Sequence, residues 1–320
     1  MGGRVAVRLE GGIGDHILGM RLLKFIRQKY PSHPIRIYSD CAGNSAQLEV
    51  AALSPLVESV TPVFQDPEKV TLSSLGAFEN LVENDRTRIA EEEVYFDGST
   101  RSLFILQSRL LGISYHEILA SRPALRIPDF RRREAAALLA PGKGCRYIAL
   151  NLGNLEASTL RQYLPYLKKF FKQLLTEQDI YIVNILSHSY KFPHWPTQER
   201  QRREVLTREN AELNMELLDW HPRIIGVVDQ PIQTVTAILK CCRHFVGIDN
   251  GIRHIAWALN VPSTILVGFQ LDDASLPQKR EALLRWFPDV HSLVPVNEFL
   301  ADPARTYNSM INRFASPQTL

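Results

Sequence analysis

The sequence predicts an α/β protein made of two similar domains, each with a parallel sheet wrapped in helices. Short apolar runs alternate with helical segments along the chain, which is the pattern of such sheets. The stretch Pro141-Gly142-Lys143-Gly144 interrupts this alternation, which then restarts. With 320 residues, 45% of them apolar, the chain is long enough for two packed cores. We therefore expect an N-terminal domain over residues 1–142 and a C-terminal domain over 143–320.

In the first half, a buried strand is expected from Val5 to Leu9, and the Gly11-Gly12-Ile13-Gly14 turn follows it. A helix is expected from Asp15 to Tyr30, where Pro31 ends it. The remaining predicted strands are 35–38, 60–64 and 94–96, and the remaining predicted helices are 44–53, 102–120 and 131–140.

The second half repeats the pattern with longer apolar runs. The predicted strands are 147–152, 180–186, 224–228, 244–248 and 263–267, and the predicted helices are 163–176, 231–242 and 251–259. Segment 187–212 is polar and basic, which favours a solvated loop with an exposed helix; contact with an acceptor substrate is the alternative.

Composition excludes several classes of protein. The net charge is only +3, with 37 basic and 34 acidic residues, so no nucleic acid partner is expected. The four cysteines lack the spacing of a zinc site, and no Asp-x-Asp ligand pair follows a strand, so no metal or cofactor is predicted. The start of the chain does not resemble a signal peptide, and no apolar run is long enough to span a membrane. A cytoplasmic protein is therefore expected.

The strongest local signal is the segment from Phe245 to His254, in which a buried strand runs into a polar turn and then a helix. Helix N-termini present backbone N–H groups and partial positive charge, so the turn Asp249-Asn250-Gly251 suits a phosphate. Arg253 and His254 can add charge-assisted donors. The alternative is structural: Asp249 or Asn250 is simply the helix cap, and His254 is a satisfied polar residue.

A second turn, Glu10 to His16, also joins a strand to a helix. It is not a dinucleotide fingerprint, because Ile17 stands where that motif needs glycine. Gly12 and Gly14 make this turn flexible, and Asp15 supplies a carboxylate at the top of the N-terminal sheet.

Together these features resemble glycosyltransferase family 9, the ADP-heptose:lipopolysaccharide heptosyltransferases. That family has a Gly-Asp turn after its first strand and a helix ending at Tyr-Pro, matched here by Gly14-Asp15 and Tyr30-Pro31. Its C-terminal hallmark resembles Val-Gly-x-Asp-[Ser/Thr]-Gly-x-x-His-x-Ala-x-Ala-x-x-x-Pro. Residues 246–262 are Val-Gly-Ile-Asp-Asn-Gly-Ile-Arg-His-Ile-Ala-Trp-Ala-Leu-Asn-Val-Pro, so Asn250 replaces the usual hydroxyl residue. The resemblance implies the GT-B fold: two Rossmann-like domains with parallel sheets facing a central cleft.

The resemblance further implies an inverting, metal-independent glycosyltransferase. The N-terminal domain would bind an acceptor, and the C-terminal domain would bind a nucleotide-diphospho-sugar, ADP-linked heptose by family default. The final helix would pack back on the N-terminal domain. The acceptor hydroxyl could belong to a glycan, a protein or a small molecule, and peripheral membrane contact stays open.

The same resemblance implies roles for individual residues. Asp15 would be the general base, with Glu10 in reserve and His16 tuning its charge. Arg161, the counterpart of a family lysine, would grip the diphosphate together with Asp249, Asn250, Gly251 and His254. Two alternatives remain: a GT-B-type isomerase or hydrolase of sugar nucleotides, and a non-catalytic protein that binds sugar nucleotides.

Overall fold

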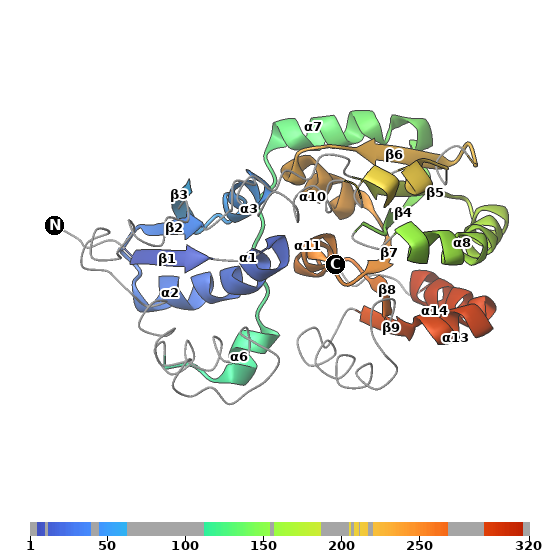
Figure 1. The fold of residues 1–320 in the computed structure, drawn as a ribbon. Helices are drawn as coiled ribbons and strands as arrows, with labels where there is room; N and C mark the ends of the chain where they lie inside the picture. The colour runs from blue at the N-terminus through green and yellow to red at the C-terminus, as the bar shows by residue number, and fades with distance from the viewer. Residues whose placement is uncertain are drawn as a thin grey trace. The chain divides into compact units, whose positions relative to one another are not determined.

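The computed structural model describes residues 5–9, 12–39, 45–62, 112–153, 157–186, 205, 208–210, 212–216, 220–267 and 291–315. The chain forms two compact units, Met1–Arg126 and Ile127–Leu320 (Figure 1). Each unit contains a parallel sheet with helices around it, as the sequence predicts.

The division between the units lies before helix α7 (Asp129–Leu138), earlier than the Pro/Gly stretch at which we expected it. The reason is that α7 packs against α10 (Ile232–Cys241) of the second unit (Figure 1). Glu134 of α7 accepts a hydrogen bond from Thr234 of α10 at 2.7 Å and also pairs with Arg131. The Pro/Gly stretch is a short 3-10 turn, η3 (Ala140–Gly142), inside the second unit.

The first unit has a parallel sheet of strand order β1-β2-β3, made of β1 (Val5–Leu9), β2 (Ile35–Ser39) and β3 (Val57–Pro62). The helix expected from Asp15 begins earlier, because Gly12 caps it, and a 3-10 turn divides it into α1 (Ile13–Gly19), η1 (Met20–Leu22) and α2 (Leu23–Lys29). The other helices described are α3 (Ser45–Ala51) and α6 (Tyr115–Ala120). The strand expected at 94–96 and most of the helix expected at 102–120 lie outside the described residues.

The second unit has a sheet of six parallel strands in the order β6-β5-β4-β7-β8-β9. Four of its strands have the predicted bounds: β5 (Ile180–Leu186), β6 (Ile224–Val228), β7 (His244–Ile248) and β8 (Ser263–Val267). The first strand is β4 (Arg146–Asn151), and an edge strand that we did not predict is β9 (His291–Pro295). Along the chain, strands are added on one side of β4 and then on the other, which is the doubly wound arrangement of Rossmann folds.

Helices cover both faces of this sheet. On one face, α8 (Ala157–Glu177), α13 (Val296–Ala301) and α14 (Pro303–Ala315) enclose the main apolar core, which includes Phe170, Phe171 and Phe299. On the other face, α10 packs between α7 and α11 (Gly251–Ala258) and contacts both (Figure 1). The last helix, α14, thus packs within the second unit, against α8. Among the described helices, none is both long and apolar enough to cross a membrane.

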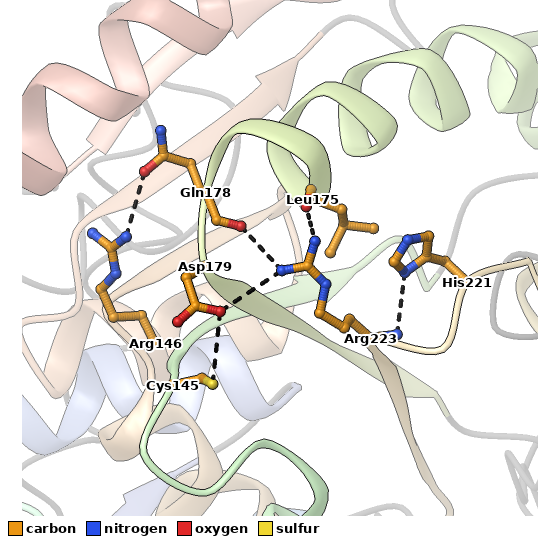
Figure 2. Close-up of polar contacts among 7 residues, drawn as sticks. All are labelled: Cys145, Arg146, Leu175, Gln178, Asp179, His221 and Arg223. Atoms are coloured by element: carbon orange, nitrogen blue, oxygen red, sulfur yellow. Dashed lines mark hydrogen bonds and ion pairs between the residues drawn. The ribbon is translucent and has the colours of Figure 1, made fainter.

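Arg223 fixes the C-terminal end of α8 to the amino-terminal end of the sheet (Figure 2). Its guanidinium donates to the backbone oxygen of Leu175, in the last turn of that helix, and to that of Gln178, the residue after the helix. A cation is favoured there because the helix dipole adds partial negative charge. The backbone N–H of Arg223 donates to Nδ1 of His221 at 3.1 Å; burial lowers the pKa of His221, and the Arg223 charge lowers it further.

Replacing Arg223 by methionine is expected to lower the free energy of unfolding by about 1–2 kcal/mol, because the carbonyl groups of Leu175 and Gln178 at the end of α8 lose a charged donor. Urea unfolding followed by circular dichroism measures the change. Arg146→Met is the control, since Arg146 is exposed and makes a long hydrogen bond of 3.4 Å to the Gln178 side chain (Figure 2). Equal losses of unfolding free energy in both variants would show that the contacts of Arg223 with the end of α8 add no specific stability.

Candidate functional site

The candidate site of the second unit lies where the strand order reverses, between β4 and β7. These two strands are parallel neighbours, with Asn151 paired to Gly247 at their carboxyl ends. The following helices, α8 and α11, cover opposite faces of the sheet. Open parallel sheets bind ligands at this kind of reversal, outside the carboxyl ends of the strands. The motif that the sequence singled out is therefore in the position that the fold favours for a ligand.

Gly247, the second residue of the 246–262 motif, allows β7 to lie close to β4. A Cβ atom at this position would lie 2.7 Å from the backbone oxygen of Asn151 and 2.5 Å from the ring of Phe245. Both distances are shorter than ordinary contacts between carbon and its neighbours, so only glycine lets β7 approach β4 this closely.

Asn250 is the N-cap residue of α11. Its side-chain oxygen accepts hydrogen bonds from the backbone N–H groups of Ile252 and Arg253, at 3.0 and 3.3 Å. Asn250 is therefore a helix cap, as the structural interpretation of the motif predicted. The cap uses two of the first three backbone N–H groups of α11. The third, that of Gly251, has no acceptor among the described residues and could bind an anion.

The Asn250 amide nitrogen faces the end of β4. It donates to Oδ1 of Asn151 at 2.6 Å and to the backbone oxygen of Gly153 at 3.3 Å. Asn151 in turn donates from Nδ2 to the backbone oxygen of Ile185 in β5, at 2.7 Å. A chain of amide hydrogen bonds therefore crosses the carboxyl ends of β5, β4 and β7. Asn151 was not predicted as a site residue.

Asp249 and Arg253 form an ion pair one helical turn apart. The guanidinium Nη2 lies 2.7 Å from Oδ1 of Asp249, and the Arg253 side chain is 1% exposed. Burial lowers the pKa of Arg253, and the adjacent Asp249 carboxylate offsets part of that effect. The charge of Arg253 is thus balanced inside the protein, and it is not presented to a ligand as the sequence suggested.

His254 accepts a hydrogen bond from Arg253. The distance between Nη2 of Arg253 and Nε2 of His254 is 3.0 Å, and a guanidinium can only donate. Nε2 of His254 is therefore the acceptor in this contact. In this arrangement Nε2 is engaged by Arg253 and Nδ1 is buried.

Arg161 lies apart from this turn, on the second turn of α8. It is exposed, and it makes no ion pair with any residue that the structure describes. The segment 154–156, which joins β4 to α8, is outside the described residues. One turn and the start of α11 thus bring Asp249, Asn250, Gly251 and His254 together, whereas no described contact joins Arg161 to them.

The first unit presents Asp15 at the start of α1. Its Oδ2 atom accepts a hydrogen bond from the backbone N–H of Gly12, the N-cap residue, at 2.8 Å. The side chain is exposed, and Oδ1 has no partner within the described part of the chain. Gly14 lies in the same first turn, whereas Glu10 falls outside the described residues. The cap holds the carboxylate in place while one oxygen faces away from it.

His16 is a structural neighbour of this turn. It is fully buried, and its Nδ1 atom lies 3.0 Å from the backbone oxygen of Gly12, which can only accept. Nε2 lies 2.7 Å from the hydroxyl of Ser39, at the end of β2. Its observed contacts therefore fix the turn to the sheet, and no contact with the Asp15 carboxylate is among them.

No metal-binding group is found in the described part of the chain, in the sense of three or more clustered histidine, cysteine or acidic side chains. The acidic pair Asp272-Asp273 and most of segment 187–212 lie outside the described residues.

The two units together have the GT-B fold of nucleotide-sugar-dependent glycosyltransferases. The solved structures with this fold include a glycosyltransferase of family 9 from Veillonella parvula, with 11% sequence identity, a TM-score of 0.57 and 97% of each chain covered. The ADP-heptose lipopolysaccharide heptosyltransferase II of Escherichia coli is 12% identical, with a TM-score of 0.58 and 97% and 98% covered. The E. coli heptosyltransferase WaaC, solved with ADP, is 15% identical, with a TM-score of 0.50 and 98% and 100% covered.

At the level of sequence, residues 178–269 match the model of glycosyltransferase family 9 (heptosyltransferase). This segment runs from the start of β5 to the end of β8 and contains the whole turn around Asn250. No curated protein matches the chain. The resemblance to glycosyltransferase family 9 is therefore confirmed over residues 178–269, and the solved structures share the fold of the chain.

Proposed function

We propose that this protein is an inverting, metal-independent glycosyltransferase that moves a sugar, heptose by family default, from a nucleotide-diphospho-sugar to an acceptor hydroxyl. The observation that carries the proposal is the turn Asp249-Asn250-Gly251, built at the strand reversal and followed by α11 within the segment that matches family 9. A cytoplasmic location is part of the proposal. The proposed reacting group of the acceptor is a hydroxyl.

The donor is proposed to bind the second unit. Two features support a diphosphate at this turn: the positive end of the α11 dipole and the N–H of Gly251. His254, in the first turn of the same helix, is proposed as a further donor. Arg161, exposed on α8, is proposed to supply the positive charge that Arg253, buried and paired with Asp249, does not. ADP is the proposed nucleotide because the similar structure of WaaC was solved with ADP.

Catalysis is proposed to come from donors that gain strength as the bond to the leaving group breaks. The nucleoside diphosphate acquires negative charge as it leaves, so N–H groups already fixed at the turn stabilise the transition state more than the bound donor. The cap and the ion pair keep Gly251 and His254 in fixed positions, which avoids reorganisation during the reaction.

Asp15 of the first unit is proposed as the general base. It would take the proton of the acceptor hydroxyl while that oxygen attacks the anomeric carbon from the side opposite the leaving diphosphate, which inverts the anomeric configuration. Its support is geometric: the carboxylate is exposed, and the hydrogen bond from Gly12 orients it.

Replacing His254 by alanine is expected to weaken the binding of a nucleoside diphosphate about tenfold, since one hydrogen bond to phosphate and its Arg253 contact are lost. Isothermal calorimetry with ADP measures the change. The matched control is His116→Ala, which removes an exposed histidine from α6 in the other unit. Unchanged ADP affinity in the His254 variant would remove this residue from the phosphate site.

The reaction is expected to proceed in excess EDTA, because N–H groups and Arg161 would replace a metal ion in neutralising the diphosphate. Initial rates of sugar transfer with and without the chelator measure this. Loss of activity that Mg²⁺ restores would contradict the proposal that no metal is needed. It would not contradict the proposal that the turn at 249–251 binds the diphosphate.

A further inference from the structure

The side chains of Asn151 and Asn250 are joined although they lie 99 positions apart in the sequence. The contact exists because the strand order places β7 beside β4, with Gly247 opposite Asn151 at the end of the ladder. Since a Cβ at Gly247 would collide with the Asn151 backbone, the absence of a side chain there is what brings the two turns within reach of one amide.

The hydrogen-bonding capacity of Asn250 is used within the protein. An asparagine amide has two N–H donors and one oxygen with two lone pairs. The donors go to Asn151 and to Gly153, at 2.6 and 3.3 Å, and the oxygen accepts from Ile252 and Arg253. Asn250 thus has no donor left for a ligand in this arrangement. A serine or threonine at this position could cap the helix, but with one hydroxyl hydrogen it could not make both contacts to the β4 turn.

Asn151 extends the connection to a third strand. Its Nδ2 atom donates to the backbone oxygen of Ile185 while its Oδ1 atom accepts from Asn250, and the residue is buried. The side chain therefore has a fixed orientation, because exchanging its oxygen and nitrogen would place an acceptor against the Ile185 carbonyl.

We infer that Asn151 and Asn250 form a positioning pair that holds the turns after β4 and β7 at the separation required to bind a diphosphate. Neither side chain donates to the phosphates; the pair places the Gly251 N–H, at the start of α11, where it can. The inference rests on the proposed function, and it assigns Asn250 a different role from that of a direct phosphate ligand.

The test is a double-mutant cycle read by calorimetry with two probes, ADP and adenosine. Asn250→Thr keeps an oxygen that can cap the helix and removes the amide that donates to Asn151. Asn151→Ala removes the acceptor of the same hydrogen bond. Each single variant is expected to lose about tenfold in ADP affinity, and the double variant no more than the larger single loss, because both substitutions break one connection. Adenosine, which has no phosphate, is expected to bind all four proteins equally.

Two controls keep the result specific. Thermal unfolding shows whether each variant is folded, and Asn308→Ser, an exposed asparagine on α14, is the matched substitution outside the site. If Asn151→Ala does not fold, the ADP affinity of Asn250→Thr still tests the positioning pair, since this variant retains the helix cap. Unchanged ADP affinity in Asn250→Thr, losses that add in the double variant, or equal losses for adenosine would each overturn the positioning pair. Failure of the wild-type protein to bind ADP or another nucleoside diphosphate would instead contradict the proposed function.

Discussion

Replacing Asp15 by asparagine is expected to reduce the turnover number about 10²–10⁴-fold, the usual contribution of a positioned general base. Asparagine keeps a side-chain oxygen that can accept the hydrogen bond from Gly12, which is 2.8 Å long, but it cannot take a proton from the acceptor. The fold of the first unit should therefore survive while the chemistry is lost. Initial rates at saturating donor, together with ADP affinity, separate these effects, and ADP affinity is expected to stay unchanged.

The molecule contains a matched control for this substitution. Glu117 occupies the same N3 position in α6, and it accepts a hydrogen bond from the backbone N–H of Ser114 at the same distance, 2.8 Å. Glu117→Gln removes a capping carboxylate without removing the proposed base, so turnover should match the wild type. Turnover in Asp15→Asn equal to that of the control would exclude Asp15 as the base.

Replacing Gly247 by alanine is expected to have the second largest effect, a loss of about 1–3 kcal/mol in the free energy of unfolding of the second unit. The added methyl group would lie 2.7 Å from the Asn151 backbone oxygen and 2.5 Å from the Phe245 ring, so β4 and β7 must move apart. That movement would also separate Asn151 from Asn250, and ADP affinity should fall with stability. Urea unfolding and calorimetry measure the two losses.

Gly153→Ala is the comparison for stability. A Cβ at Gly153 would approach the Asn151 side chain no closer than 3.6 Å, an ordinary contact distance, so this variant should unfold close to the wild-type midpoint. If Gly247→Ala were equally stable, the close approach of β7 to β4 would not be what positions the turn.

Continuous apolar runs made the strands of the second unit predictable, because strands covered by helices on both faces need no polar alternation. The runs at 180–186, 224–228, 244–248 and 263–267 give the observed strand bounds. The edge strand β9 was missed: its sequence, His-Ser-Leu-Val-Pro, mixes polar and apolar residues and ends in proline. The polar start of α8 likewise lacks the apolar period that marks the rest of the helix.

Local sequence identified the turn at 249–251 but not how its side chains are used. Whether Asn250 caps a helix or binds a ligand depends on what faces it, and the residue that faces it, Asn151, comes from a strand 99 positions away. The spacing of Asp249 and Arg253, four residues apart, is compatible with an ion pair. Only the burial of Arg253 shows that its charge is neutralised inside the protein and does not face a ligand. The motif thus located the candidate turn, and the strand order determined its hydrogen bonds.

The most direct test of the account is to incubate the purified protein with ADP-heptose, with and without a panel of hydroxyl-bearing acceptors, and to follow the products by mass spectrometry and NMR. The account predicts an acceptor heavier by one sugar residue, inverted anomeric configuration, release of ADP, and little donor consumed when no acceptor is present. Donor that is isomerised or hydrolysed at the same rate without acceptor would contradict it.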